Sequence, residues 1–182
     1  MKLRRLLLPI LAVASIAGLS ACGKDGPQRT SESEGTYVTV SGLQYQVQIS
    51  RQLNPTDTED SGYLTGIPAQ QAVLGPDDVW FGVFLRVKND GHQVRRSAIH
   101  FVLQDTTGAV FGPIAGDNLV TYRPVILHPD ELSPAPEEVA ASGPTQGKLV
   151  LFKLKNATLN NRPLVLYITG PSGERGSVKI DV

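Results

Sequence analysis

The feature that most limits the fold of this chain is a set of short segments in which apolar and polar residues alternate. Between residues 43 and 50, the apolar Leu43, Tyr45, Val47 and Ile49 are separated by glutamines. A period of two places successive side chains on opposite faces of a β-strand, so this segment is predicted to be a strand with one buried face. No stretch keeps a helical period over several turns, and only residues 69–74 fit one or two helical turns.

Other segments show the same alternation or form compact apolar runs between turn residues. They are 37–40, 79–88, 99–104, 109–111, 119–127, 147–155, 164–169 and 177–182. Pro124 interrupts one of them, as expected for an edge or bent strand, and 18 Gly and 13 Pro residues supply turns. We therefore predict an all-β fold, an immunoglobulin-like antiparallel β-sandwich of about seven to eight strands with long Pro/Gly-rich loops.

Two predicted connections, 51–78 and 113–146, are longer than those of most compact domains. The strand between them, 79–88, places five apolar residues on one face but Trp80 and Phe84 on the other. We expect the 113–146 loop or the second sheet to cover these two aromatic side chains. If they were exposed, they would form a surface for a partner or a ligand.

The first 21 residues have the pattern of a secretory signal peptide. Three basic residues stand within the first five positions, and an apolar run of 14 residues, 6–19, follows them. That run is too short for a helix across about 30 Å of hydrocarbon, which needs roughly 20 residues. We therefore assign 1–21 to a cleaved signal peptide.

The end of this segment, Leu19-Ser20-Ala21-Cys22, resembles the lipobox of bacterial lipoproteins. In that family a diacylglyceryl group is attached to the cysteine thiol, and signal peptidase II cuts just before it. The resemblance implies that Cys22 is lipidated and holds an extracytoplasmic protein on the cell membrane, since two acyl chains anchor stably. We expect 22–35 to contain this cysteine and a flexible polar tether, and 36–182 to form the immunoglobulin-like domain.

Segments 80–91, 101–108, 147–152 and 163–166 resemble strand-and-turn segments of exported bacterial immunoglobulin-like domains. These domains occur mostly as lipoproteins or secreted proteins and are grouped with the immunoprotective extracellular antigen fold. The resemblance implies the same sandwich at the cell envelope, and it supplies no catalytic residue.

The charge of the chain gives no sign of nucleic-acid binding. Basic and acidic residues number 17 each, and the 14 basic and 17 acidic residues beyond Cys22 leave a net charge of −3. A nucleic-acid surface would need clustered Lys and Arg. No phosphate-binding glycine loop is present, and we expect no cofactor.

The candidate chemistry of the side chains is equally limited. His92, His100 and His128 stand far apart, and no serine lies in a Gly-x-Ser-x-Gly motif, so we expect neither a hydrolase nor a metal site. The acidic segment 57–62 resembles the start of a calcium loop, but Pro68 stands at the twelfth position, where such a loop needs Glu. We interpret the segment as a solvated acidic loop, with weak calcium binding left open.

We therefore expect a lipid-anchored, non-catalytic binding or interaction module of the cell envelope, with a protein or small molecule as its ligand. The alternative is a small-solute or metal-binding lipoprotein with its site under the 113–146 loop, and an enzyme with a carboxylate site is a third reading. An exposed Trp80 and Phe84 would favour the first, an enclosed polar pocket the second, and two acids in a cleft the third.

The role of Cys22 is tested by Cys22→Ala. We expect this variant to lose palmitate labelling and to move from the membrane fraction to the soluble fraction, because no thiol remains to carry the lipid. Metabolic labelling and fractionation measure both outcomes. Membrane retention of the variant would contradict the anchoring argument.

Overall fold

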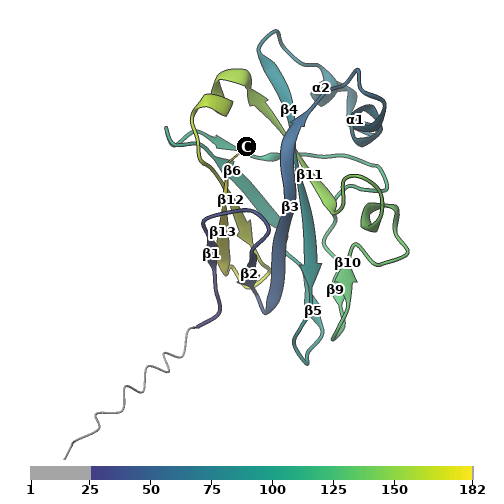
Figure 1. The fold of residues 1–182 in the computed structure, drawn as a ribbon, viewed down its shortest axis with the longest axis vertical. Helices are drawn as coiled ribbons and strands as arrows, with labels where there is room; N and C mark the ends of the chain where they lie inside the picture. Colours follow the sequence, from purple (N-terminus) through teal and green to yellow (C-terminus); the bar gives the residue numbers. More distant parts are fainter. Residues whose placement is uncertain (1–25, 182) are drawn as a thin grey trace, which may run out of the picture.

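A computed structural model describes residues 26–181, which form two β-sheets packed face to face (Figure 1). One sheet has the strand order β2-β3-β4-β11-β8, with β10 also paired to β4, and the other has the order β1-β13-β12-β6-β7. A separate two-stranded ribbon joins β5 and β9. All pairs are antiparallel except that of β1 with β13, which is parallel.

The strands are β1 (Thr30–Ser31), β2 (Tyr37–Val40), β3 (Leu43–Leu53), β4 (Asp78–Lys88), β5 (Arg95–Arg96), β6 (His100–Gln104), β7 (Val110–Phe111), β8 (Pro113–Ile114), β9 (Ile126–Leu127), β10 (Leu132–Ser133), β11 (Lys148–Lys155), β12 (Leu164–Thr169) and β13 (Arg175–Ile180). The helices are α1 (Thr58–Tyr63) and α2 (Ala69–Ala72), with 3₁₀ turns η1 (Val139–Ala141) and η2 (Asn156–Asn160).

The prediction of an all-β sandwich is confirmed. Within residues 26–181, seven strands have four residues or more. An immunoglobulin sandwich has strands lettered A to G in chain order, with the order A-B-E-D in one sheet and C-F-G in the other. The same two orders result here when the letters are given in turn to β3, β4, β6, β8, β11, β12 and β13. The two long predicted connections join β3 to β4 and β8 to β11.

Two details of the predicted strands are wrong. The β3–β4 pairing slips between Val47 and Ile49, and this β-bulge turns Ile49 outward, so that its side chain is 39% exposed instead of sharing the buried face. The segment 119–127 is not one strand, because only Ile126–Leu127 pairs with β5, while Thr121 forms an isolated bridge to Leu149.

The folded part begins before Thr36, where the predicted tether was expected to end. Thr30–Ser31 pairs with β13, and the backbone N–H of Thr39 donates to the carbonyl oxygen of Gln28 at 2.6 Å. The polar composition of this segment concealed a strand because β1 contributes backbone hydrogen bonds to the sheet edge and buries only Ser31.

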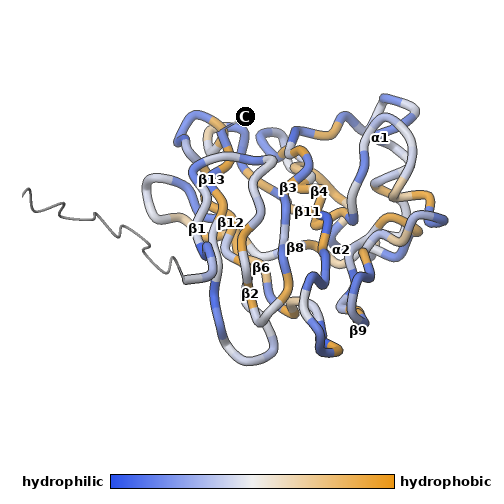
Figure 2. The backbone as a smooth tube through the Cα atoms, turned by 60° about the horizontal axis from the view of Figure 1, so that its bottom comes forward, coloured by the Kyte–Doolittle hydropathy of each residue, from blue (hydrophilic) through white to orange (hydrophobic). Residues whose placement is uncertain are grey.

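The main core lies between the two sheets, where the orange, apolar stretches of the strands concentrate in Figure 2. Phe81, Val83, Leu85 and Val87 of β4 enter it as the alternation predicts, and all are at most 1% exposed. Burial of a large apolar side chain contributes about 1.5–3 kcal/mol, so this face of β4 supplies much of the driving force for folding.

The opposite face of β4 is also buried, in a second cluster that we call the outer core. Its buried members are Leu53, Trp80, Phe84, Val120, Ala140, Leu149 and Leu151. The 113–146 connection covers this face as expected, and the 54–77 connection also packs on it through Tyr63, Leu64, Ile67 and Leu74. Gly82 permits this packing, because a Cβ there would lie 3.0 Å from Leu149 and 3.1 Å from the Phe84 ring.

The only tryptophan of the chain reports directly on the outer core. Trp80 is 3% exposed, and the ammonium of Lys153 lies 5.4 Å from its ring centroid. We expect native Trp80 emission to be shifted to the blue and weakly quenched by acrylamide, because water and acrylamide cannot reach a buried indole. The chain unfolded in urea serves as the control. Equal quenching in the native and unfolded states would show that the two long connections do not cover this face.

Candidate functional site

A cleft opens at the edge of the sandwich where the chain passes from β7 to β8 and changes sheets. We call it the edge cleft, and its volume is about 310 Å³. It is lined by Ile99, Phe101, Pro113, Ile114, Ala115, Gly116, Thr121, Tyr122, Arg123, Pro124, Leu149, Val150 and Leu151. The strands β6, β8 and β11 thus form its walls, and the beginning of the 113–146 connection forms its rim.

Backbone hydrogen bonds explain why the chain leaves a gap here. Leu149 donates to the carbonyl oxygen of Val120 at 2.7 Å and accepts from the N–H of Tyr122 at 2.8 Å. The segment 120–122 is therefore fixed along the edge of β11, next to the place where β8 pairs with Leu151. Residues 115–119 bulge away between these two attachments, and the edge cleft lies beside them.

Asn118 holds the bulged segment in place. Its Nδ2 donates to the carbonyl oxygens of Tyr63 at 2.9 Å and Thr65 at 3.1 Å, while its Oδ1 accepts from the N–H of Thr121 at 2.9 Å. One side chain therefore joins the end of α1 to the rim of the cleft. The cleft rim is therefore linked to the outer core, because Asn118 bonds the rim segment to the connection that covers this core.

A group of buried hydroxyls supports the cleft wall that Tyr122 forms. The Tyr122 hydroxyl donates to the carbonyl oxygen of Ala98 at 3.0 Å and lies 2.9 Å from the Ser97 Oγ, and the Ala98 N–H donates to the Tyr45 hydroxyl at 2.6 Å. Burial raises the pKa of Tyr122 to about 12, and burial likewise raises the pKa of Tyr45. Both phenols therefore stay protonated at neutral pH, so they serve as hydrogen-bonding supports.

The lining of the edge cleft suits binding of an apolar group. Among the described residues that line it there is no carboxylate, imidazole or thiol, and Arg123 is the single charged side chain. Arg123 pairs with Asp117 at the surface, where the two side chains are 62% and 81% exposed. Ligand sites are typically apolar clefts of about 300–1,000 Å³ with a few polar groups, and this cleft lies at the lower end of that range.

The residues singled out by sequence do not converge on the edge cleft. Cys22 lies outside the described residues. His92, His100 and His128 are exposed, and His128 contacts Glu131 at 3.2 Å. Within residues 26–181 no group of three His, Cys, Asp or Glu side chains is placed to hold a metal ion.

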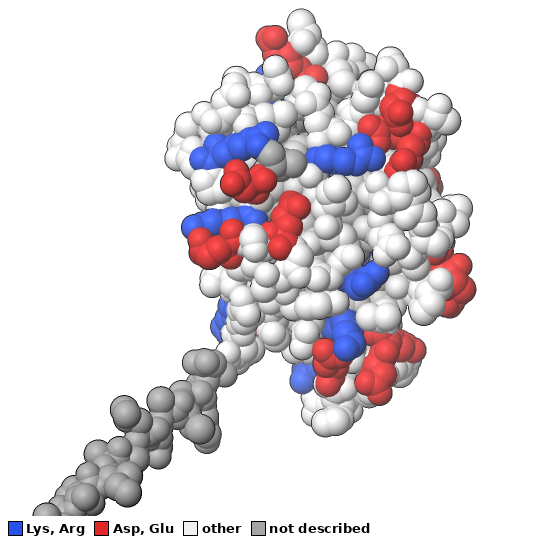
Figure 3. All heavy atoms as spheres, viewed as in Figure 1, with Lys and Arg blue, Asp and Glu red and all other residues white. Residues whose placement is uncertain are grey.

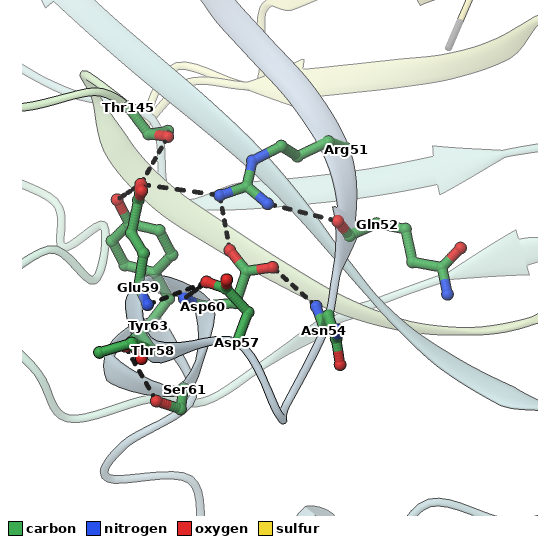
Figure 4. A network of polar contacts seen from close by, with 10 residues as sticks. All are labelled: Arg51, Gln52, Asn54, Asp57, Thr58, Glu59, Asp60, Ser61, Tyr63 and Thr145. Atoms are coloured by element: carbon green, nitrogen blue, oxygen red, sulfur yellow. Dashed lines mark hydrogen bonds and ion pairs between the residues drawn. The ribbon is translucent and has the colours of Figure 1, made fainter.

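The prediction of a solvated loop at 57–62 is wrong. This acidic segment contains most of helix α1 (Figure 4). The Asp57 carboxylate caps the helix by accepting from the N–H groups of Glu59 at 2.9 Å and Asp60 at 3.0 Å. Asp60 is 5% exposed and pairs with Arg51 at 2.6 Å. An Asp with acidic residues in the following turn is a recognisable helix start, and this signal could have identified α1 from the sequence.

The carboxylates of Glu59 and Asp60 fasten the long connections to β3 through the Arg51 guanidinium. Glu59 accepts from the Tyr63 hydroxyl at 2.6 Å and the Thr145 hydroxyl at 2.9 Å, and it lies 3.7 Å from the Arg51 guanidinium. Figure 4 shows the carboxylates of Glu59 and Asp60 both turned toward the Arg51 guanidinium. Arg51 thereby holds the 54–77 connection to β3 directly. Through Glu59, it is also linked to Thr145 of the 113–146 connection.

The face seen in Figure 3 carries charges of both signs. Lys and Arg alternate with Asp and Glu over it. Within residues 26–181, no helix is long and apolar enough to cross a membrane.

Comparison with known proteins relates the chain to solved bacterial structures through its fold. The yjhA protein of Bacillus subtilis superposes with a TM-score of 0.55 at 11% identity, covering 82% of this chain and 99% of that one. The ycdA protein of Bacillus subtilis, described as a candidate lipoprotein, gives 0.50 at 15% identity over 82% of this chain. This chain corresponds to 39% of the ycdA chain. No family model and no curated protein sequence matches the chain.

The Arg51–Asp60 pair is tested by Asp60→Asn. Burial alone would raise the pKa of Asp60, but hydrogen bonds from Arg51 and the Asn54 N–H, together with the charge of Arg51, lower it. We expect the variant to lose about 1.5–3 kcal/mol of unfolding free energy at pH 7, the range for hydrogen bonds to charged groups. Urea unfolding measures this loss.

The stabilisation by the Asp60 carboxylate should decrease as the pH falls. A carboxyl whose pKa is lower in the folded state stabilises above its unfolded pKa of about 3.9, and the stabilisation is lost as the pH falls through the folded value. The difference between the wild type and Asp60→Asn should therefore shrink in acid. Asp117→Asn, in the exposed pair with Arg123, is the matched control, with an expected loss below about 1 kcal/mol. Equal losses for the two variants at pH 7 would contradict the fastening role of Asp60.

Proposed function

We propose that this protein is a lipid-anchored, extracytoplasmic binding module of the cell envelope, without catalytic activity, and that its edge cleft binds a small apolar group. The observation that carries the proposal is the composition of this cleft. It combines apolar walls with one exposed guanidinium and contains no side chain able to transfer a proton at neutral pH. General acid–base catalysis needs such a side chain within hydrogen-bonding reach of the substrate.

The geometry favours an apolar cleft over the two sites predicted from the sequence, an exposed aromatic patch and an enclosed polar pocket. Trp80 and Phe84 are 3% and 0% exposed, so they offer no aromatic patch to a partner. The edge cleft lies at the start of the 113–146 connection, where the alternative site was expected, but it is open and mostly apolar instead of enclosed and polar. An apolar part of a small molecule or of a peptide side chain fits these walls better than a metal ion.

The anchoring part of the proposal rests on the lipobox-like sequence ending at Cys22. The likeness in fold to ycdA, itself described as a candidate lipoprotein, is compatible with this location. A tethered domain does not need high affinity in solution, because anchoring raises its concentration near ligands held in the same envelope.

The cleft is tested with the neutral fluorescent probe N-phenyl-1-naphthylamine and residues 23–182, the mature chain without its lipidated cysteine. We expect saturable binding with enhanced probe emission, because the cleft walls exclude water from the probe. Ala115 is exposed and lines the cleft, so Ala115→Trp should place an indole in its mouth. We expect the variant to weaken binding about tenfold, or about 1.4 kcal/mol.

Ala109→Trp provides the matched control, since Ala109 is also exposed but does not line the cleft. Circular dichroism checks that both variants fold as the wild type does. Unchanged affinity of Ala115→Trp, or an equal loss in Ala109→Trp, would mean that the probe binds elsewhere and would refute the edge cleft as the site.

A further inference from the structure

The chain enters the fold at one end of the sandwich, which we call the anchor end. The turns at this end are 41–42, 89–94, 128–131 and 170–174. Arg29 pairs with Glu174 at 3.4 Å, its carbonyl oxygen accepts from the Ser177 N–H at 2.8 Å, and Ser41 Oγ lies 2.7 Å from Ser172 Oγ. Figure 1 shows β1, β2 and β5 reaching toward this end, with α1 and α2 at the other.

Covalent geometry limits how far this end can stand from a lipid on Cys22. The first residue bonded to the sandwich is Gln28, whose carbonyl oxygen accepts from the Thr39 N–H. Six residue steps separate Cys22 from Gln28, and a fully extended chain of that length spans at most about 22 Å. The opposite end is roughly 35 Å further away along the 11 residues of β4.

The anchor end carries a ribbon with an unusual surface. Arg96 of β5 lies opposite Ile126 of β9, so the two side chains share a face. Ile126 is 61% exposed, and Val94 next to the ribbon is 53% exposed. Val94, Arg95 and Arg96 also line a groove of about 400 Å³ with the turns at 41–42 and 171–174. Exposed aliphatic side chains beside arginines are suited to the boundary between headgroups and acyl chains.

The other charges at this end are mostly compensated within the fold, but Asp130 of the 128–131 turn forms no ion pair within residues 26–181 and adds one negative charge. Arg29 pairs with Glu174, and Lys88 pairs with Asp90. Arg95 and Arg96 form no ion pair with another residue of the described range 26–181, and Arg95 donates to the Gln93 side chain at 2.7 Å. These two guanidinium groups therefore remain available to phosphate oxygens, which guanidinium binds in a bidentate manner.

We propose that the anchor end rests on the membrane surface, with Arg95 and Arg96 against phospholipid phosphates and Val94 and Ile126 in the headgroup region. This inference rests on the proposed lipid anchor. It goes beyond it by giving the domain a fixed orientation, in which α1 and α2 point away from the bilayer. The edge cleft shares no lining residue with the groove at the anchor end.

The orientation is tested with the full-length chain, processed and lipidated in a bacterial host and reconstituted in vesicles of equimolar phosphatidylcholine and phosphatidylglycerol. Cys22 is the only cysteine and is consumed by the lipid, so Val94→Cys introduces a single free thiol for a fluorophore. Phosphatidylcholine with a nitroxide on its headgroup quenches only nearby fluorophores. Val73→Cys, at an exposed valine of the opposite end, is the matched control.

We expect nitroxide lipid to cause a loss of emission at Val94→Cys and none at Val73→Cys. Adding Arg95→Gln and Arg96→Gln should reduce the loss at position 94, whereas Arg162→Gln at the opposite end should not. Equal quenching at both positions, or none at position 94, in a chain that floats with the vesicles would overturn the orientation alone. A chain that does not float with vesicles would overturn the lipid anchor, and the orientation with it.

Discussion

The structure depends on the burial of both faces of one strand, β4. Its inner face packs into the main core between the sheets, and its outer face packs into the outer core formed by Trp80, Phe84 and the two long connections. Between Trp80 and Leu85 the strand is buried on both sides, so the connections cannot detach without exposing large aromatic surfaces to water. The long connections are thus part of the folded structure.

The same constraint accounts for the position of the proposed binding site. The 113–146 connection must cross the outer face of β4 and also reach the edge of β11, where Leu149 bonds to Val120 and Tyr122. Between these attachments it cannot follow the sheet edge closely, and the edge cleft is the space that results. The Arg51–Asp60 pair holds the other connection to β3, and Asn118 bonds that connection to the first, so the segment beside the cleft is fixed as well.

Much of the fold was predictable from sequence because period-two alternation and turn residues act locally. Strands 79–88, 147–155 and 164–169 lie within one residue of their predicted bounds. The bulge that exposes Ile49 depends on pairing with β4, and the strand at Thr30–Ser31 depends on an available edge of β13, so neither leaves a local pattern. Helix α1 did leave one, in the Asp57 cap. The edge cleft was predictable only as a region, because its walls combine β6 and β8 with β11, which is distant from them in sequence.

The central claim is that the edge cleft, made by the chain leaving the edge of β11, is the binding site of the domain. An amide NMR titration of residues 23–182 with N-phenyl-1-naphthylamine tests it most directly. The account predicts that shifts concentrate in 99–101, 113–116, 121–124 and 149–151, the segments that line the cleft. Shifts confined to other segments, such as α1 or the anchor end, would contradict it.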